Sequence, residues 1–556
     1  LAHVPIHSEH YLKIKTADDN TNIFNTPLYR KFRGMLTFLL HHKAGTIIGI
    51  VLMLIVSVCC FSFLPQTFFP DLTYNQIYME YKMPEGTRIE KVEKDLEEIE
   101  RYLKTNPAIT HVTTSLGGTP ARYNLVRSVA DPSLRYGELI IDFKSHKDID
   151  NCMQDLQEYM NRHYPDAFIR LKKYNTMYME FPIEILVSGP DPGVLKELRD
   201  KIQDIMREEP SAMLITDNWD DPVINMDINF NQHNARRAGL GKTDIGLSLL
   251  SVTEGIPVGS LYDGSISKNI YLKNIGYNSL EDVTVNSMLP NITAVTEEES
   301  IQRMLMDAER KQLLIDRLTS GRPVKEISDS ISFEWKDPVA YRYNGQRAVI
   351  VQCNNAYGFT AEDTRLALEK KINERIDFPD GYSMKWLGEY KASTDSNKYL
   401  FRSLPIAVIF MFAVLVFLFR DFKKPLIIFL CLPLAYIGIV MGIFVSGKPF
   451  SFVAVVGALG LIGMMIKNGV VLIDEITAQI KTGVEPVEAL LSASSSRLRP
   501  VMMASGTTIL GMIPLISDAM FGPMAVAIMG GLLVGTIITL MIIPVFYALF
   551  FKIKCD

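Results

Sequence analysis

The stretch GALGLIGMMIKNGVVLIDEI, residues 457–476, is apolar enough to cross a membrane except at one central pair, Lys467 and Asn468. A charged side chain at the centre of a bilayer costs roughly 2.5–3.5 kcal/mol on insertion-derived scales. The Lys467 ammonium therefore has two options. Its long stem can carry it to the membrane surface near Asp474 and Glu475, or it can face the protein interior and pair with a carboxylate. The residues alone leave both open.

Six segments of the chain are apolar over about 20 residues, the length that a transmembrane helix requires. They lie at about 45–64, 403–419, 425–445, 450–473, 500–517 and 524–550. Acidic residues stand only at or beyond the ends of these segments, so a carboxylate partner for Lys467 would have to come from elsewhere. The 556-residue chain is therefore expected to be an α-helical membrane protein with six transmembrane helices.

The positive charges of the short connections set the expected orientation. Lys and Arg precede the first segment and follow the second, fourth and sixth, whereas the other two short connections hold few. Both ends of the chain are expected on the cytoplasmic side, with the long middle region translocated, which in a bacterium means the periplasm. The net charge of −5 is too small for a chain of this length to indicate nucleic-acid binding.

The long middle region alternates strand and helix patterns. A strand, a helix and a strand follow one another at 76–116, again at 183–219 and again at 347–390. Three such units predict a large α+β region built of ferredoxin-like βαβ subdomains. A Gly-rich stretch at about 240–290 predicts a separate lobe of helix and hairpin, while 293–323 is polar like a surface insertion.

The expected domain boundaries follow from these patterns. Residues 1–43 form a cytoplasmic linker that ends either in an interfacial amphipathic helix or in an extension of the first span at 44–65. The translocated α+β region covers 66–400 and a five-helix transmembrane bundle covers 401–552. Residues 553–556 are a cytoplasmic tail.

Two short patterns have residue types that can bind a ligand. GLGKT at 239–243 lacks the first glycine of a phosphate-binding loop, because Arg236 stands at that position. His3, His7 and His10 are spaced closely enough to ligate a metal, but they also fit a solvated tail, which is the usual state of a chain end. Neither pattern predicts a cofactor.

Met177 and Met179 in the pattern MYME are the remaining metal candidates. Thioether sulfur is a soft ligand suited to Cu(I), although packing on one face of a strand explains the same spacing. The six cysteines form no CxxC pair or disulfide framework, and no spacing indicates a catalytic pair of carboxylates or a nucleophile with its base. The sequence therefore does not predict an enzyme.

The region around Lys467 resembles the signature of the resistance-nodulation-division (RND) efflux transporters, hydrophobe/amphiphile (multidrug) type. The resemblance runs from residue 460 to 515, and stretches 68–93 and 236–250 fit the family as well. Its matching elements are Lys467-Asn468, Leu472, Asp474, Gly483, Glu488-Ala489, Ala493, Arg497, Arg499-Pro500, Gly511 and Pro514. Six spans with one long loop look like the C-terminal half of the family's twelve-span, two-loop chain.

This resemblance implies a proton-driven antiporter of the bacterial inner membrane that exports drugs or other amphiphilic compounds. It implies a homotrimer, surrounded by membrane lipid, that works with a periplasmic adaptor protein and an outer-membrane channel. Porter subdomains and a docking-type lobe at about 240–290 would handle the substrate. The energy source would be the proton gradient, with no cofactor.

The resemblance also assigns a proton relay. Lys467, with Asn468 beside it, would pair with two aspartates on the missing N-terminal half. Arg497 would lie at the cytoplasmic end of the relay, although a positive-inside anchor explains this residue equally well. Where many drug pumps have a relay threonine this chain has Ala504, which leaves Ser505, Thr507 and Thr508 as possible substitutes.

The drug-pocket segment departs from the family pattern. HVTTSLGGTPARYNL at 111–125 stands where a phenylalanine-rich segment lines the pocket of drug pumps. Two alternatives to drug export therefore stay open within the same fold. One is a metal-ion exporter, for which Met177 and Met179 are a weak signal, and the other is an accessory of lipid or protein export.

Overall fold

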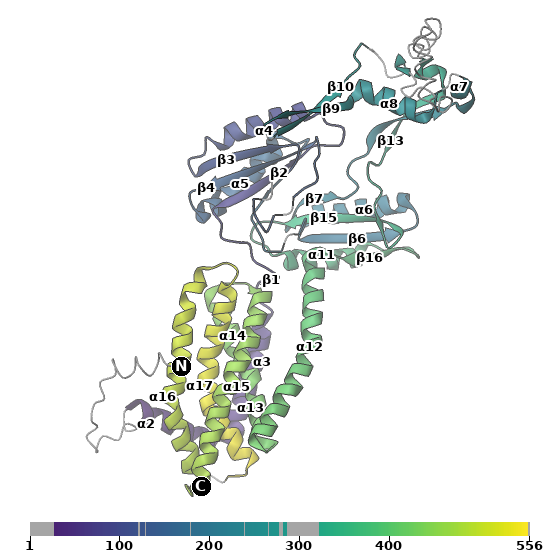
Figure 1. The fold of residues 1–556 in the computed structure, drawn as a ribbon. Helices are drawn as coiled ribbons and strands as arrows, with labels where there is room; N and C mark the ends of the chain where they lie inside the picture. Colours follow the sequence, from purple (N-terminus) through teal and green to yellow (C-terminus); the bar gives the residue numbers. More distant parts are fainter. Residues whose placement is uncertain are drawn as a thin grey trace, which may run out of the picture. The chain divides into compact units, whose positions relative to one another are not determined.

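The computed structural model describes residues 27–120, 123–127, 129–177, 179–237, 240–264, 266–276, 282–285 and 322–553 (Figure 1). The chain folds into two compact units, one of Leu1–Trp219 with Ala340–Asp556 and one of Asp220–Val339. His3, His7 and His10 lie outside the described residues, as do most of the polar 293–323 stretch and the last three residues.

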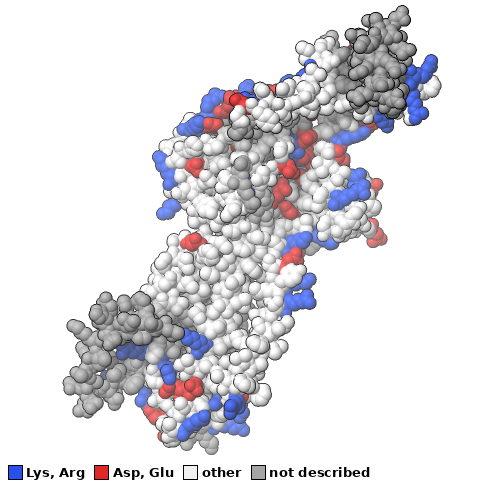
Figure 2. Space-filling view, in the orientation of Figure 1, with Lys and Arg blue, Asp and Glu red and all other residues white. Residues whose placement is uncertain are grey.

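Six helices of the described chain are long and apolar enough to cross a membrane. They are α3 (Lys43–Phe61), α12 (Gly388–Phe419), α13 with α14 (Lys423–Cys431 and Ala435–Ser446), α15 (Phe452–Lys481), α16 (Pro486–Met512) and α17 (Gly522–Phe550). The third span is interrupted by the 3-10 turn Leu432–Leu434, because Pro433 has no N–H to donate. In the face drawn in Figure 2, charged side chains gather at the end of this bundle and leave its middle apolar.

Close backbone packing fixes α17 in the bundle, where it is the most buried of the six helices. Gly438 and Gly442 of α14 meet Gly530 of α17, and a Cβ on Gly530 would lie 2.5 Å from the carbonyl oxygen of Gly438. Small residues four apart let two helices approach in this way, as dispersion contacts in lipid require. The same approach leaves no room for a side chain.

The segment before the first span forms its own helix, α2 (Pro27–His41). Its apolar residues Phe32, Leu36 and Leu40 are buried against the bundle, where α2 contacts α16 and α17. Its Arg33 pairs with Glu488 at the start of α16. His42 has a non-helical backbone and separates α2 from α3. The amphipathic helix expected here is therefore present, and it is not an extension of α3.

The α/β part of the first unit contains two antiparallel sheets. One has the strand order β3-β4-β2-β5 and includes β2 (Gln76–Lys82), β3 (Ile109–Leu116), β4 (Tyr136–Phe143) and β5 (Phe168–Lys172). Helices α4 (Ile89–Leu103) and α5 (His146–His163) bury their apolar faces on this sheet. Alternate residues of β2 such as Ile77, Met79 and Tyr81 point into that core.

The second sheet repeats this plan. Strands β6 (Ile183–Gly189), β7 (Ala212–Asp217), β15 (Gln346–Asn355) and β16 (Ser383–Trp386) pair in the order β7-β15-β6-β16, with β14 (Arg342–Tyr343) also on β15. Helices α6 (Pro192–Arg207) and α11 (Ala361–Arg375) cover it. The second and third expected units thus share one sheet.

The expectation of three βαβ units was wrong by one. The fourth unit is β4, α5 and β5, and it completes the first sheet. Its strand β4, YGELIIDF, has a Gly-Glu pair at its second and third positions, and the buried Glu138 breaks the apolar pattern by which a core strand is recognised. Glu138 is tolerated there because it is ion-paired.

The second unit interrupts the chain between β7 and β15. A two-stranded ribbon of β8 (Val223–Phe230) and β13 (Ser328–Lys336) leads to a small core around α7 (Gln232–Arg237), α8 (Lys242–Thr253), β11 (Thr284–Val285) and β12 (Arg322–Pro323). A hairpin of β9 (Ile256–Asp263) and β10 (Ile266–Leu272) follows α8. The helix and hairpin expected in the 240–290 lobe are both present.

The second sheet continues directly into the membrane bundle. Helix α12 starts two residues after β16, at Gly388, and runs without interruption for 32 residues. Gly388 has φ +59°, and a Cβ there would lie 2.5 Å from the carbonyl oxygen of Pro182. A second link is the parallel pair of β1 (Gln66–Thr67), which follows α3, and β17 (Phe450–Ser451), which precedes α15.

We predict that Gly530→Ala lowers the thermal stability of the purified protein in detergent, because the new methyl group overlaps the backbone of α14. Overpacking of this kind costs roughly 1–3 kcal/mol. Gly506→Ala on α16 is the matched control, since nothing lies within 4 Å of a Cβ there. Equal melting temperatures for the two variants would contradict the close packing.

Candidate functional site

Helix α15 has one exposed stripe, and Lys467 lies in it. The exposed residues of this helix are Val456, Gly460, Gly463, Lys467, Asp474, Ala478 and Lys481, and the first five of them precede its last two turns. They are three, four or seven positions apart, which places them on one face of a helix with 3.6 residues per turn. We call these five residues the α15 stripe. It combines small residues, which permit close approach of another helix, with a charge that needs a partner.

Gly457 belongs to a different face. A Cβ on it would lie 2.7 Å from Met524 Cγ of α17, whereas Gly460 and Gly463 have nothing within 4 Å. Among the described residues, no carboxylate lies within ion-pair distance of the Lys467 ammonium. Asn468 is half-buried beside it. The α15 stripe is thus a surface to which the described chain itself supplies no partner.

Arg497 of α16 lies beside the C-terminal part of α15. Its guanidinium pairs with Glu475 of α15, while its Nε is buried without a hydrogen-bond partner among the described residues. This ion pair links α15 to α16. Arg499, two residues on, is exposed.

The three hydroxyl candidates on α16 fall into two groups. Ser505 is buried and its Oγ lies 2.8 Å from Thr536 Oγ1 of α17. Thr507 and Thr508 both donate to the carbonyl oxygen of Ala504, at 2.9 and 3.0 Å. Ala504 and Thr507 are exposed, so Thr507 can meet another helix, whereas Ser505 contacts only the bundle's interior.

The α/β region contains a cleft of about 410 Å³ lined by four methionines. Met177 and Met179 come from the connection between β5 and β6, Met153 from α5 and Met213 from β7. The two methionines singled out in the sequence therefore lie outside any strand, and the strand-packing interpretation is wrong. Met177 is 37% exposed, so its thioether is accessible.

Charged residues are buried on the sheet next to this cleft. Arg127 bridges Glu80 of β2 and Glu138 of β4 at 3.0 and 2.6 Å, and Arg170 of β5 binds Glu80 at 2.5 Å. The side chains of this group are at most 10% exposed. Burial alone would raise the pKa of Glu80, but Arg170, Lys172 and Arg127 hold that pKa below its usual value. We call Glu80, Arg127, Glu138 and Arg170 the buried ion cluster.

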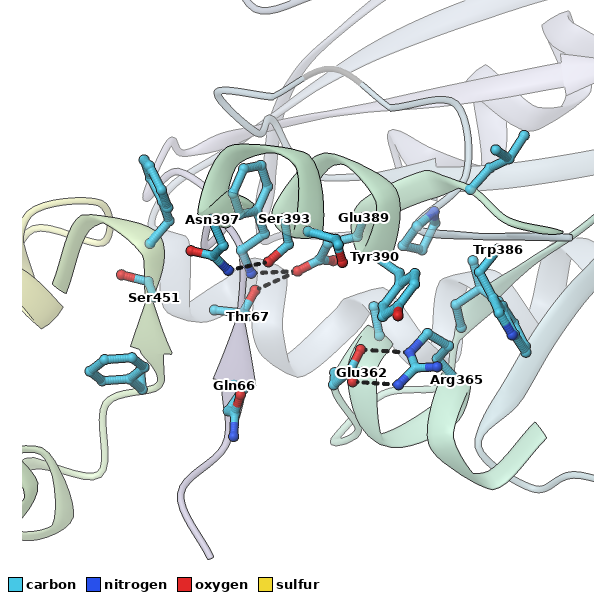
Figure 3. Close-up of a pocket in the computed structure, with 18 of the residues that line it drawn as sticks. Gln66, Thr67, Glu362, Arg365, Trp386, Glu389, Tyr390, Ser393, Asn397 and Ser451 are labelled. Atoms are coloured by element: carbon cyan, nitrogen blue, oxygen red, sulfur yellow. Dashed lines mark hydrogen bonds and ion pairs between the residues drawn. The ribbon is translucent and has the colours of Figure 1, made fainter. Parts of the chain in front are cut away.

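A smaller pocket of about 170 Å³ lies where the second sheet meets the bundle (Figure 3). Glu389, in the first turn of α12, accepts hydrogen bonds from Phe68 N at 2.5 Å and from Thr67 Oγ1 at 3.3 Å. Arg365 of α11 pairs with Glu362 and stacks on Tyr390, 4.2 Å from the ring centre. The hydrogen bonds of Glu389 hold the first turn of α12 against the end of β1.

Two features of the site were not found by sequence reasoning. Met153 and Met213 carry no local signal, because they are far from Met177 in the chain and meet it only through folding. The buried ion cluster has a faint one, since Tyr78, Glu80 and Lys82 alternate along β2 opposite its apolar residues. Among the described residues, no group of three His, Cys, Asp or Glu could hold a metal ion.

Six long apolar helices, joined to an α/β region and carrying a lysine without an ion-pair partner among the described residues, define a multi-pass membrane protein. Comparison with known proteins identifies the family: the AcrB/AcrD/AcrF family model matches residues 4–551. The chain belongs to this family of RND transporters, whose members are transporters rather than enzymes.

The names of individual relatives indicate different functions. The chain is 26% identical over 532 residues to the swarming motility protein SwrC of Bacillus subtilis, covering 94% of this chain and 47% of that protein. It is 22% identical to the cobalt-zinc-cadmium resistance protein CzcA of Cupriavidus metallidurans, covering 94% and 48%. The chain spans about half the length of these curated relatives.

A solved structure shares the fold. The crystal structure of a heavy metal efflux pump superposes with a TM-score of 0.72 at 18% identity, covering 94% of this chain and 52% of that one. The relatives with metal in their names include the nickel and cobalt resistance protein CnrA of Cupriavidus metallidurans, at 25% identity over 65% of this chain and 32% of that protein.

We predict that Arg127→Met strongly destabilises the first sheet, because it removes the counter-charge of the buried Glu138 carboxylate and leaves it with hydroxyl donors such as Tyr136. Breaking a buried pair in this way costs roughly 3–5 kcal/mol. Hydrogen exchange of the β2 and β4 amides measures the effect. Arg207→Met is the control, since Arg207 and its partner Asp204 are both more than half exposed and such pairs contribute roughly 0–1 kcal/mol. Unchanged protection in Arg127→Met would contradict the account.

Proposed function

We propose that this chain forms part of an RND exporter that carries a soft metal cation, Cu(I) or Ag(I). The observation that carries this proposal is that four methionines, Met153, Met177, Met179 and Met213, line one cleft. Thioether sulfur selects soft cations. The main interpretation from sequence was drug export, and the relatives named for metal resistance favour the metal alternative instead.

The donor set also indicates which metals fit less well. Zinc, cobalt and nickel are usually held by imidazole, carboxylate or thiolate groups. The described residues bring no such group of three together. Neutral thioethers bind a soft cation without first losing a proton, so affinity for the metal does not depend on ligand deprotonation. The cargo proposed for this chain therefore differs from the metals in the relatives' names.

The α15 stripe supports proton coupling. We propose that carboxylates from outside the described chain, on the N-terminal half expected from the resemblance, complete this surface and pair with Lys467. Their protonation would remove the charge that holds the ammonium, and α15 would move. Each proton that crosses supplies about 2.3 kcal/mol per 100 mV of membrane potential. Asn468 and Thr507 would border this pair, and Arg497 with Glu475 would hold its cytoplasmic end.

The connections described above provide a route from this pair to the cleft. Helix α15 is preceded by β17, which pairs with β1, and Glu389 holds the residues after β1 against α12. Helix α12 in turn is continuous with β16 of the second sheet. Movement of α15 would therefore displace a sheet edge rather than a flexible loop. The α/β region would be periplasmic and ferredoxin-like in its subdomains, in an inner-membrane homotrimer with an adaptor protein and an outer-membrane channel.

Export of an amphiphile is the second candidate, and one observation favours it. The aromatic residues Phe69, Tyr357 and Phe359 line the same cleft as the methionines. Flat apolar rings suit an organic molecule, and Tyr357 and Phe359 are 38% and 48% exposed. The two candidate functions differ in whether the methionine sulfurs are needed to bind the cargo.

We predict that the double variant Met177→Leu/Met179→Leu loses Ag(I) binding by roughly tenfold or more, while its fold is kept because leucine matches methionine in volume. Calorimetric titration of the purified protein with Ag(I) measures this. Met441→Leu/Met503→Leu removes two exposed methionines of the bundle and is the control. Undiminished Ag(I) affinity, with loss of amphiphile binding on Phe359→Ala, would favour the second candidate.

We predict that Lys467→Met abolishes proton-coupled export in cells that carry the complete transport system, because the partner carboxylates lose their counter-charge. Metal sensitivity of growth and proton flux in membrane vesicles measure this. Lys481→Met, the same substitution in the last turn of the same helix, is the control and should export normally. Normal export by Lys467→Met would remove Lys467 from the mechanism.

A further inference from the structure

The connection between β5 and β6 carries Met177 and Met179 into the cleft, and its backbone is held by charged side chains. We call its described residues, 173–177 and 179–182, the methionine segment. Lys172 donates to the carbonyl oxygens of Met179 and Glu180 at 2.5 and 3.1 Å. Arg170 donates to the carbonyl oxygen of Glu180 through Nη1 at 2.5 Å. Two cations thus converge on two consecutive peptide groups.

The buried ion cluster aims the Arg170 guanidinium. Its Nε and Nη2 both bind the same oxygen of Glu80, at 2.7 and 2.5 Å, which leaves Nη1 directed at the methionine segment. Phe181 packs its ring on the guanidinium, 4.2 Å from ring centre to Cζ. Glu80 is in turn held by Arg127 through its other oxygen. The orientation of Arg170 is therefore set from the centre of the sheet.

The other end of the methionine segment is anchored separately. Asn175 donates to the carbonyl oxygen of Phe69 at 2.9 Å and to Asp71 at 3.1 Å, and its own side-chain oxygen accepts from Met177 N at 3.0 Å. The two methionines therefore lie between two fixed points. Neither anchor uses a methionine side chain, so both sulfurs stay available.

We infer that Lys172 and Arg170 are positioning residues of the cargo site, which hold the backbone of the methionine segment so that its two thioethers face the cleft. This inference rests on the proposed function, because it assigns a role within the same site. Holding the segment before the cation arrives means that its ordering entropy is not lost again on binding, and this raises affinity.

Electrostatics alone predicts that loss of Lys172 strengthens cation binding, which is the opposite of what a positioning role predicts. Lys172 and Lys173 both line the cleft, and removing a positive charge there should favour a bound cation by Coulomb's law. If Lys172 acts through position, its loss instead weakens cation binding. Lys173, the first residue of the methionine segment, directs its ammonium to Asp150 of α5 at 2.5 Å rather than to the carbonyl oxygens of that segment. It is therefore a neighbouring control with the same charge and the same substitution.

The charged and titratable groups around Lys172 stay constant in this comparison. They come from β2, β5, the loop after β3, and the segments that flank the cleft: Glu80, Arg170, Arg127, Asp71, Glu180, Lys173, Tyr357 and Glu389. All variants are compared at a single pH, so that no difference in bulk proton concentration enters. Burial and Arg170 lower the pKa of Lys172 to about 7, and pH 6 keeps its ammonium protonated.

The test compares Lys172→Met, Lys172→Arg and Lys173→Met in the full chain at pH 6. Ag(I) affinity is measured by calorimetry, and the mobility of the Met177 and Met179 methyl groups by NMR with labelled methionine. We expect Lys172→Met to bind Ag(I) roughly tenfold more weakly, with both methyl groups more mobile. Lys172→Arg, which keeps a donor, should restore both, and Lys173→Met should bind as well as or better than the parent.

The outcomes separate this inference from the function on which it rests. Rigid methyl groups in Lys172→Met, or unchanged or tighter Ag(I) binding, would overturn the positioning role. Absence of Ag(I) binding by the parent protein would overturn the cargo, while mobile methyl groups in Lys172→Met alone would still show that Lys172 positions the segment. Should Lys172→Met fail to fold, Lys172→Gln supplies a shorter side chain, and the same two measurements decide.

Discussion

An unpaired ammonium in an apolar helix is the constraint on which the rest of this protein depends. Lys467 stands in the middle of α15, and the described chain offers it no carboxylate. Placing a charge in hydrocarbon is costly, and proteins that do so use the charge. The surrounding stripe has room for another helix, because Gly460 and Gly463 have nothing within 4 Å of a Cβ, whereas Gly438 and Gly530 meet backbone inside the bundle. In the proposed function, the bundle therefore forms one side of an interface.

The rest of the structure connects the bundle to the α/β region. Backbone contact between α14 and α17 makes the bundle core rigid, and the continuous α12 joins it to the second sheet. Polar contacts at the junction are few but specific, with Glu389 accepting from the backbone next to β1. On the first sheet, Arg170 and Lys172 hold the backbone of the methionine segment, and methionines and aromatic side chains together line the cleft.

Much of this architecture could be predicted from the sequence, because helices and strands produce periodic patterns of apolar residues. Apolar runs marked all six helices, and the amphipathic pattern of α2 gave its separate helix. Three of the four βαβ units followed from alternation, whereas the unit with Glu138 did not, since a buried charge imitates a surface strand until its partner is known. Spacing of three residues does not place glycines on one helix face, because three-residue steps drift by about 60° each, so Gly457 and Gly463 face different neighbours.

The candidate sites divided in the same way. Lys467 was found because its signal is local, a charge within an apolar run. Met153 and Met213 were not, because only folding brings them to Met177. Likewise Ser505, Thr507 and Thr508 look equivalent in sequence, and the structure separates them by the face on which each hydroxyl lies. Sites assembled from distant segments need the fold before they can be recognised.

The most direct test of the central claim is the environment of the Lys467 ammonium itself. Solid-state NMR can measure the dipolar contact between the Lys467 nitrogen and carboxylate carbons in protein isolated from native membranes with all that copurifies, with Lys467→Met identifying the signal. The account predicts a carboxylate within about 4 Å, the ion-pair range, at alkaline pH, and loss of that contact as the pH falls and the carboxylate is protonated. A lysine signal without a carboxylate neighbour at any pH would contradict it.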